Sequence, residues 1–280
     1  MSQPIKLDAS AAGTLSIGGV LTVNRLGFGA MRLTGPGIWG EPPDPAAARA
    51  ILRRAVELGV NFIDTADSYG PEVNERLIAE ALHPYPSGLV IATKGGLTRS
   101  GPDQWARDAR PRHLREACEG SLKRLRVESI TLYQLHAPDP RVPIEESLGE
   151  LAKLQQEGKI QHIGVSNFDV PLLERASKVV RVVSVQNRYN IEDRASDPVI
   201  DYCTERGIAF IPWYPLGAGG HARADAQSDE LERIADRHKV TRAQAALAWL
   251  LARSPVMLPI PGTSSLAHLE ENIAAASIRL

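Results

Sequence analysis

The sequence predicts an α/β fold, a (β/α)8 TIM barrel preceded by an N-terminal β-hairpin. Short apolar runs alternate with longer amphipathic stretches, eight such pairs follow one another, and no composition break divides the 280 residues. Eight parallel strands close into a barrel, and barrels of this length are common as single domains. Residues 1–280 are therefore expected to form one domain.

The predicted elements follow from hydrophobic spacing along the chain. Strands are expected at 25–30, 61–64, 89–94, 129–136, 159–166, 182–187, 208–213 and 256–260. Helices are expected at 45–58, 72–82, 111–125, 144–157, 169–178, 197–206, 228–252 with a break near Val240, and 264–275.

The first helix shows the signals that define its ends. Asp44 is expected to cap it, Pro45 suits its first turn, and Gly59 suits its C-terminal stop. Before the first barrel strand, the segment GTLSIGGVLTVNRL predicts two short strands around Gly18 and Gly19. This hairpin is expected to cover the bottom opening of the barrel.

An open, doubly wound sheet is the competing architecture. Such a sheet usually carries a G-x-G-x-x-G phosphate loop after its first strand. Here that turn reads GFGAMRLTGPGIWG, which contains glycines but lacks the required spacing into a helix. The barrel is favoured, and the glycines at 35, 37 and 40 are interpreted as part of a flexible loop at its mouth.

Composition excludes several classes of function. The hydrophobic fraction is 43%, the charged fraction is 23% and the net charge is -1, so neither nucleic acid nor an anionic membrane is an expected partner. Cys118 and Cys203 belong to no close Cys or His cluster, so neither a disulfide nor a metal site is expected. The N-terminus lacks the apolar core of a signal peptide, and a cytoplasmic location is expected.

Polar residues follow three successive apolar runs of the predicted barrel. Asp64, Lys94 and His136 stand at strand ends, and Tyr69 lies on the loop after the first of these strands. Taken singly, each has a structural interpretation, as a turn cap, a solvated lysine, a packing tyrosine or a structural histidine. Because the C-terminal ends of barrel strands face one mouth, together they predict a convergent polar site.

These residue types suit proton donation. A tyrosine with an unperturbed pKa of about 10 gives up its proton poorly at neutral pH. The ammonium of Lys94 is expected to lower the pKa of Tyr69, and the carboxylate of Asp64 is expected to hold the lysine in place.

Eight stretches give the chain its resemblance to a known family. They are LGFGAMR, FIDTADSYG, ATKGG, LYQLHAP, IGVSNF, VQNRYN, PWYPLG and IPGTSSLAHLEEN. In order and spacing the chain resembles the aldo-keto reductases over nearly its whole length. The segments GAMRLTGPGIWG, VQNRYN and IPGTSSLAHLEEN further resemble a bacterial branch that includes pyridoxal reductases.

The resemblance implies an NAD(P)-binding barrel that reduces a small-molecule carbonyl compound, an aldehyde or ketone, to an alcohol. Hydride from the nicotinamide reaches the carbonyl carbon, and Tyr69 protonates the oxygen. Lys94, Asp64 and His136 assist as cation, anchor and hydrogen-bonding group. NADPH is the family's usual cofactor, and NADH remains possible. Pyridoxal and other small aromatic aldehydes are the expected substrates.

The resemblance also assigns a cofactor site. Ser166, Asn167 and Gln186 would hold the carboxamide, and Trp213 would stack on the nicotinamide ring. Leu216 and Gly217 would lie near the pyrophosphate, and Thr263, Ser264 and Ser265 near a 2′-phosphate. The remaining expected contacts are Met31, Asp64, Tyr214, Gly262, His268, Glu271 and Asn272. Gly262 and His268 stand where many relatives have fixed cations, which limits the expected preference for NADPH.

Two tryptophans are expected at the substrate side. Trp39 lies in the glycine-rich loop, and Trp105 lies in the polar loop 98–110. Two other functions remain open: a cofactor-binding, redox-sensing regulatory subunit, and an aldolase-type barrel in which Lys94 forms a Schiff base. A monomer is expected, because no exposed apolar heptad suggests a subunit contact.

Overall fold

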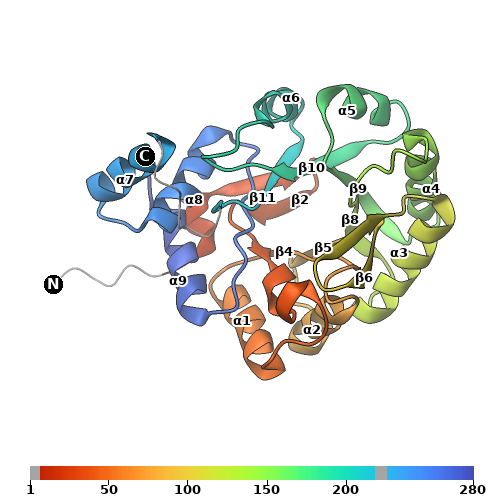
Figure 1. Cartoon of the computed structure of the whole chain (residues 1–280), viewed down its shortest axis with the longest axis horizontal. Helices are drawn as coiled ribbons and strands as arrows, with labels where there is room; N and C mark the ends of the chain where they lie inside the picture. The colour runs from red at the N-terminus through yellow and green to blue at the C-terminus, as the bar shows by residue number, and fades with distance from the viewer. Residues whose placement is uncertain (1–6, 218–225) are drawn as a thin grey trace.

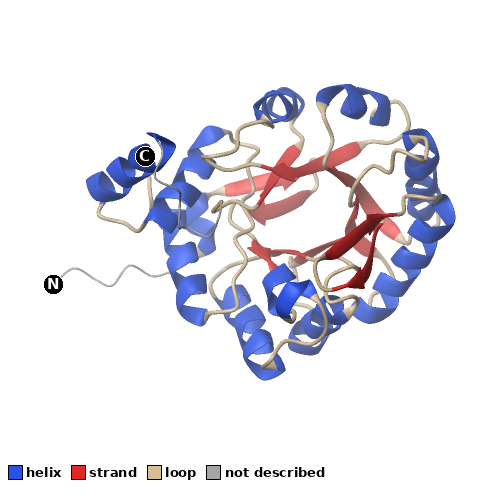
Figure 2. Cartoon of the chain, in the orientation of Figure 1, coloured by secondary structure: helices blue, strands red, loops and turns tan. Residues whose placement is uncertain are grey.

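The computed structural model describes residues 7–217 and 226–280 of the chain, and it confirms the predicted barrel. Figure 1 and Figure 2 show a ring of strands enclosed by helices. The described residues form a parallel seven-stranded sheet in the order β11-β10-β9-β8-β5-β4-β3. These strands are β3 (Phe28–Gly29), β4 (Phe62–Asp64), β5 (Val90–Gly95), β8 (Ile130–Leu135), β9 (Ile160–Ser166), β10 (Val182–Arg188) and β11 (Ala209–Trp213).

The eighth barrel position differs from the prediction. Residues 256–260 form no regular strand, and only a single parallel bridge joins Phe210 to Met257. The segment still closes the ring, because the Leu258 amide donates to the Phe210 carbonyl at 2.9 Å and the Gly27 amide donates to the Pro259 carbonyl at 2.9 Å. Proline has no N–H to donate, so Pro259 and Pro261 prevent a continuous ladder here.

The helices surround the strands in the predicted order. Those described are α1 (Pro45–Glu57), α2 (Val73–Leu82), α3 (Pro111–Leu125), α4 (Ile144–Gln156), α5 (Val170–Ala176), α6 (Asp197–Arg206), α7 (Ala226–His238), α8 (Arg242–Arg253) and α9 (Leu266–Ala274). Asp44 caps α1 by accepting from the Ala47 amide at 2.9 Å, as predicted. The predicted break near Val240 is confirmed, because Thr241 and Gln244 form a capping box that begins α8.

Two hairpins flank the barrel, and only the first was predicted. Strands β1 (Thr14–Ile17) and β2 (Leu21–Asn24) turn at Gly18 and Gly19, and Arg181, directly before β10, donates to the Gly18 carbonyl at 3.0 Å. This hairpin therefore covers the N-terminal ends of the strands, and β2 lies behind the strand ring in Figure 1.

The second hairpin corrects the prediction of an irregular loop at 98–110. Strands β6 (Leu97–Gly101) and β7 (Gln104–Arg107) pair antiparallel on the opposite side of the barrel. All of β7 is exposed, so it lacks the alternation of apolar and polar residues that identifies a half-buried strand from sequence.

Both cysteines are buried and free, which confirms that no disulfide joins them. Burial raises the pKa of each thiol to about 12, so neither is a reactive thiolate. None of the helices in the described ranges is long and apolar enough to cross a membrane.

Candidate active site

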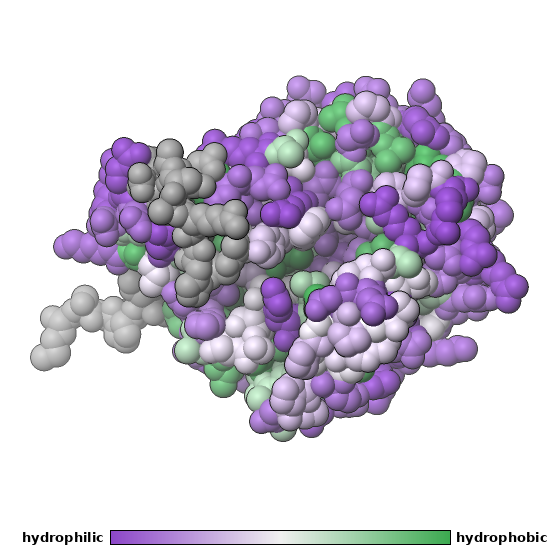
Figure 3. Space-filling model, in the orientation of Figure 1, coloured by the Kyte–Doolittle hydropathy of each residue, from purple (hydrophilic) through white to green (hydrophobic). Residues whose placement is uncertain are grey.

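Four predicted residues meet at the C-terminal end of the barrel. Asp64 ends β4, Lys94 lies near the end of β5, His136 directly follows β8, and Tyr69 lies in the loop before α2. Their exposed fractions are 3% for Asp64, 0% for Lys94, 6% for Tyr69 and 7% for His136. Figure 1 looks onto this end, and Figure 3 shows mostly hydrophilic side chains around a hollow near its centre.

Lys94 connects the other members of the cluster. Its Nζ donates to Asp64 Oδ2 at 2.7 Å, to the Thr65 carbonyl at 2.8 Å and to the Tyr69 hydroxyl at 3.4 Å. An ammonium has three N–H donors, so all of them are used. Burial alone lowers the pKa of Lys94, but Asp64 and Tyr69 outweigh it and raise that pKa above its ordinary value.

The pKa of Tyr69 differs from the prediction in its direction. Burial of the phenol raises the pKa, and the opposing effect of the nearby Lys94 ammonium does not overcome it. The expected net lowering is therefore wrong for the protein without ligands. Burial could not be read from the sequence, because Tyr69 lies on a loop with no periodic pattern. The consequence is a phenol that keeps its proton through neutral pH.

Two glutamine amides hold the other oxygen of Asp64. Gln186 Nε2 donates to Asp64 Oδ1 at 2.8 Å, and Gln134 Nε2 donates to the same oxygen at 3.3 Å. Gln134 was not predicted as a site residue. A signal was present, because Gln134 stands on β8 two residues before His136, which directly follows that strand, and alternate residues of an extended chain share one face.

His136 is neutral at physiological pH. Burial and, to a lesser extent, the charge of Lys94 hold the pKa of His136 well below 6.5. Its Nδ1 lies 3.4 Å from the hydroxyl oxygen of Ser68, and its ring meets the Tyr69 ring edge to face at 5.7 Å between centroids. A neutral imidazole has one N–H donor and one acceptor nitrogen, so His136 can form a directional hydrogen bond to a bound oxygen.

Asn167 links the ends of three strands beside this cluster. Its side-chain amide donates to the His136 carbonyl and to Ser166 Oγ, both at 3.1 Å, and its backbone N–H donates to the Gln186 carbonyl at 3.0 Å. Trp213 Nε1 donates to Asn167 Oδ1 at 3.1 Å. The structure therefore brings together all four residues predicted to surround the nicotinamide.

The turn after β11 carries three more predicted cofactor residues, Tyr214, Leu216 and Gly217. Tyr214 and Gly217 have φ angles of 60° and 63°, and the Gly217 amide donates to the Tyr214 carbonyl at 3.1 Å. This turn directly follows Trp213. The Arg188 guanidinium faces the rings of both Trp213 and Tyr214.

The predicted adenosine end lies where α9 begins. Ser265 caps this helix, accepting from the His268 amide at 3.4 Å, and its own amide donates to Thr263 Oγ1 at 3.0 Å. Ser264 and His268 are exposed. Within α9, Asn272 is buried and Glu271 is half-buried.

Gly262 lies against the backbone of β3. A Cβ on Gly262 would collide with the Gly29 carbonyl oxygen, so this position accepts no side chain. Met31 is half-buried in the short 3-10 helix Ala30–Leu33, which directly follows β3. Both residues therefore lie near the place where β3 meets residues 256–260, the segment that closes the barrel.

Arg99 organises the predicted substrate side and was not identified from the sequence. Its guanidinium stacks on Trp105 at 3.7 Å and faces Trp39 at 5.8 Å. It also donates to the carbonyls of Ile38 at 2.7 Å and Ser68 at 3.2 Å. Trp105 in turn meets the Tyr69 ring edge to face at 6.3 Å. Arg99 thus joins the second hairpin to the loop that carries Trp39.

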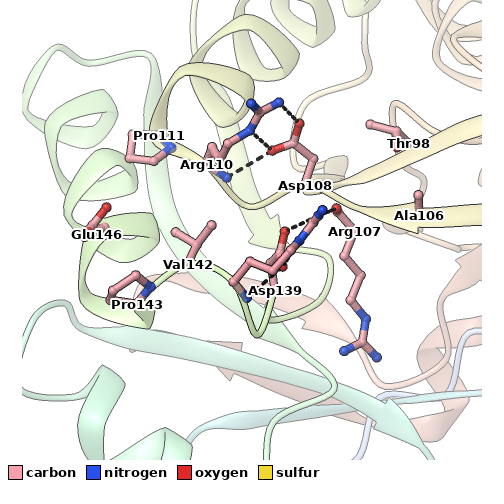
Figure 4. A pocket seen from close by; sticks show the side chains of 11 residues that line it. Thr98, Ala106, Arg107, Asp108, Arg110, Pro111, Asp139, Val142, Pro143 and Glu146 are labelled. Atoms are coloured by element: carbon pink, nitrogen blue, oxygen red, sulfur yellow. Dashed lines mark hydrogen bonds and ion pairs between the residues drawn. The ribbon is translucent and has the colours of Figure 1, made fainter.

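A cavity away from this cluster lies on the same end of the barrel. It measures about 620 Å³ and lies between the β6–β7 hairpin and the loop after β8 (Figure 4). Its lining includes two ion pairs, Arg110 with Asp108 at 2.5 Å and Arg141 with Asp139 at 2.8 Å. None of the four predicted residues Asp64, Tyr69, Lys94 and His136 lines this cavity.

Sequence comparisons identify similar proteins over nearly the whole chain. A model described as the aldo/keto reductase family matches residues 25–280. An uncharacterised oxidoreductase of Schizosaccharomyces pombe is 52% identical over 98% of this chain and 88% of its own length. Pyridoxine 4-dehydrogenase of Escherichia coli is 44% identical over 94% of this chain and 92% of its own length.

Solved structures show the same architecture. A glycerol dehydrogenase from Gluconobacter oxydans aligns with a TM-score of 0.85 at 28% identity, covering 96% of this chain and 91% of that one. An aldo-keto reductase from Klebsiella pneumoniae in complex with NADPH aligns with a TM-score of 0.80 at 26% identity, covering 95% of this chain and 90% of that one.

Proposed function

We infer that this chain, which belongs to the aldo/keto reductase family of oxidoreductases, is an NAD(P)H-dependent carbonyl reductase. The comparisons confirm the resemblance seen in the sequence motifs. The observation that carries the activity is the contact of Lys94 with both Asp64 and the Tyr69 hydroxyl in a buried site beside a neutral imidazole.

Each side chain of the site has its own role in the reduction. A bound NAD(P)H supplies the hydride that reaches the carbonyl carbon. Tyr69 donates its proton to the carbonyl oxygen, and the Lys94 ammonium stabilises the phenolate that remains. Asp64 fixes Lys94, and His136 orients the carbonyl oxygen through a hydrogen bond. The raised pKa of Tyr69 keeps the phenol protonated before a substrate arrives, and the Lys94 ammonium acts against that rise.

The described residues fit a nicotinamide carboxamide. Ser166 and Asn167 offer a hydroxyl and an amide at the end of β9. Because Gln186 directs its Nε2 to Asp64, its Oε1 is the atom left to accept from the carboxamide N–H₂. The half-buried Trp213, fixed by Asn167, offers a ring face for stacking.

We expect NADPH to bind more tightly than NADH, but by a modest margin of about tenfold or less. The free N–H groups at the start of α9 favour an anionic phosphate. The position of Gly262, however, has no room for a cationic side chain. Of these two positions, only that of His268 can therefore carry a cationic side chain. His268→Arg should therefore increase the preference by about tenfold, because a guanidinium can form a charge-assisted hydrogen bond to the phosphate.

Matched titrations of the wild type and His268→Arg with NADPH and NADH measure this preference. The affinity for NADH serves as the internal control and should stay nearly constant. Tighter binding of NADH by the wild type, or an unchanged ratio in the variant, would contradict the phosphate site at α9.

Small aromatic aldehydes such as pyridoxal are the proposed substrates. The rings of Trp105 and His136 both meet the Tyr69 ring edge to face, and the Arg99 guanidinium faces both Trp105 and Trp39. The similarity to a pyridoxine 4-dehydrogenase supports the same class. A cofactor-oxidation assay over a panel of aliphatic and aromatic aldehydes tests this. Absence of turnover with every aldehyde and ketone, while cofactor binds, would refute the reductase.

Arg99→Met is expected to raise KM for an aromatic aldehyde by about three- to tenfold with a smaller change in kcat. The substitution removes the cation that stacks on Trp105 and the donors that hold the Trp39 loop. Steady-state kinetics measure the effect. Arg112→Met, at a side chain that is 90% exposed on α3, is the matched control. Equal KM values in the two variants would show that Arg99 does not shape the pocket.

The alternatives receive less support from the site. A Schiff-base lysine must lose its proton, whereas Lys94 is held as an ammonium by Asp64. Borohydride trapping with a carbonyl substrate would reveal an adduct at Lys94 if that mechanism operated. A regulatory subunit would retain cofactor tightly with slow turnover. One NAD(P)-binding domain over residues 1–280, a monomeric state and a cytoplasmic location stay predictions.

A further inference from the structure

A buried amide on α2 joins the backbone segments that carry the partners of Lys94. Asn74 is the second residue of α2 and is fully buried. Its Oδ1 accepts from the hydroxyl of Thr65 at 2.6 Å, and its backbone N–H donates to the Tyr69 carbonyl at 3.1 Å. Its Nδ2 donates to the Ala30 carbonyl, directly after β3, at 2.8 Å. Asn74 therefore ties the loop between β4 and α2 to the end of β3.

Thr65 is the link between Asn74 and the ammonium of Lys94. It directly follows Asp64, the last residue of β4, and is fully buried. Its carbonyl accepts from Lys94 Nζ at 2.8 Å, while its hydroxyl donates to Asn74. Its own amide donates to the Ala92 carbonyl on β5 at 2.8 Å. One residue thus accepts from the lysine through its backbone and is held by Asn74 through its side chain.

The Thr65 carbonyl helps to decide where the Lys94 ammonium lies. Lys94 Nζ donates to Asp64 at 2.7 Å and to this carbonyl at 2.8 Å. Its third N–H donates to the Tyr69 hydroxyl at 3.4 Å, the longest of the three distances. A small displacement of the ammonium would break this long contact first. Asn74 holds the hydroxyl of Thr65 and the carbonyl of Tyr69, so it fixes the backbone on both sides of that contact.

A second threonine provides a comparison in the same region. Thr93 directly precedes Lys94 on β5, is also fully buried, and donates its hydroxyl to Glu75 Oε1 at 2.6 Å. Glu75 follows Asn74 on α2. The two threonine hydroxyls therefore bind neighbouring residues of one helix, with hydrogen bonds of equal length. Of the two threonines, Thr65 is the one whose carbonyl accepts from Lys94 Nζ.

We propose that Asn74, acting through Thr65, positions the Lys94 ammonium against the Tyr69 hydroxyl. Asn74 and Thr65 act through other side chains, so they are positioning residues. The consequence for catalysis rests on the proposed reductase, in which Lys94 stabilises the phenolate that Tyr69 leaves behind. A displaced ammonium would weaken this stabilisation in the transition state, whereas the binding of the carbonyl compound and of NADPH would change little.

Thr65→Val removes the hydroxyl that donates to Asn74 and keeps the backbone carbonyl and the shape of the side chain. We expect kcat for carbonyl reduction to fall about three- to tenfold, with KM for the carbonyl compound and the affinity for NADPH nearly unchanged. Thr65→Ser keeps a hydroxyl and should have a kcat near the wild-type value. Asn74→Ala removes the acceptor itself and should lower kcat at least as much as Thr65→Val.

Thr93→Val is the matched control, because it removes an equally short hydrogen bond from an equally buried side chain. It should lower the urea midpoint about as much as Thr65→Val and leave kcat near the wild-type value. Urea denaturation also shows whether each variant is folded, and Asn74→Ala keeps the test open if Thr65→Val does not fold. An equal loss of kcat in Thr65→Val and Thr93→Val would overturn the proposal, since general loosening of this end of the barrel would explain both.

A measurement on Lys94 itself separates this proposal from the proposed reductase. The ammonium of a buried lysine gives a ¹H–¹⁵N signal in NMR spectra of the full-length protein, and the double variant Asp64→Asn/Lys94→Met assigns it. We expect Thr65→Val and Asn74→Ala to shift this signal, and Thr93→Val to shift it less. Such shifts in a protein that reduces no carbonyl compound would support the positioning of Lys94 and refute only the reductase. A signal that keeps its wild-type position in folded Thr65→Val and Asn74→Ala would refute the positioning.

Discussion

Replacing Tyr69 with phenylalanine is expected to lower kcat for carbonyl reduction by about 10²–10⁴-fold, because general acid catalysis contributes about that much. The ring remains to pack beside Trp105 and His136. Only the hydroxyl that Lys94 contacts at 3.4 Å is lost. The affinity for NADPH should therefore stay nearly unchanged, which a fluorescence titration of the same preparation measures.

A variant of a second tyrosine serves as the control for the loss of the acid. Tyr202→Phe removes a hydroxyl from α6, outside the proposed site, and should leave kcat at the wild-type value. A Tyr69→Phe variant that retained kcat within a factor of a few would show that another group, or water, protonates the substrate. A large loss of cofactor affinity would instead indicate that the hydroxyl contributes to binding.

The position of the site could be predicted because all strands of a parallel barrel run in the same direction. Apolar runs that end in Asp64, Lys94 and His136 require these side chains to lie at one end once the strands are parallel. The register confirms the reason: Lys94 pairs with Gln134 on the neighbouring strand, two residues before His136. Periodicity thus located three residues that are far apart in the sequence.

Other features depend on contacts that no local pattern records. Gln134 is one polar residue in an apolar strand, and its role depends on the distance from its amide to Asp64. In the sequence, Arg99 resembles an ordinary surface cation. Its stacking on Trp105 forms only when the β6–β7 hairpin folds. The predicted direction of the Tyr69 pKa shift was wrong. The shift depends on burial of the phenol, which arises only when the chain folds.

Lys94→Met is expected to damage both activity and stability. The phenolate of Tyr69 would lose the ammonium that stabilises it, so kcat should fall by at least about 10²-fold. Asp64 would also remain buried without its counter-ion, held only by the amides of Gln134 and Gln186. Removing one partner of a buried ion pair typically costs about 3–5 kcal/mol in the free energy of unfolding. Urea denaturation measures this loss separately from kinetics.

The double variant Asp64→Asn/Lys94→Met separates the two effects. Without either charge, most of the stability lost in Lys94→Met should return, because no uncompensated ion is left in the site. Catalysis should stay at the level of Lys94→Met, since the phenolate still lacks its cation. The two variants therefore differ in the urea midpoint and agree in kcat. If the double variant recovered kcat along with stability, Lys94 would be a structural anchor of the barrel end and not the cation that assists Tyr69.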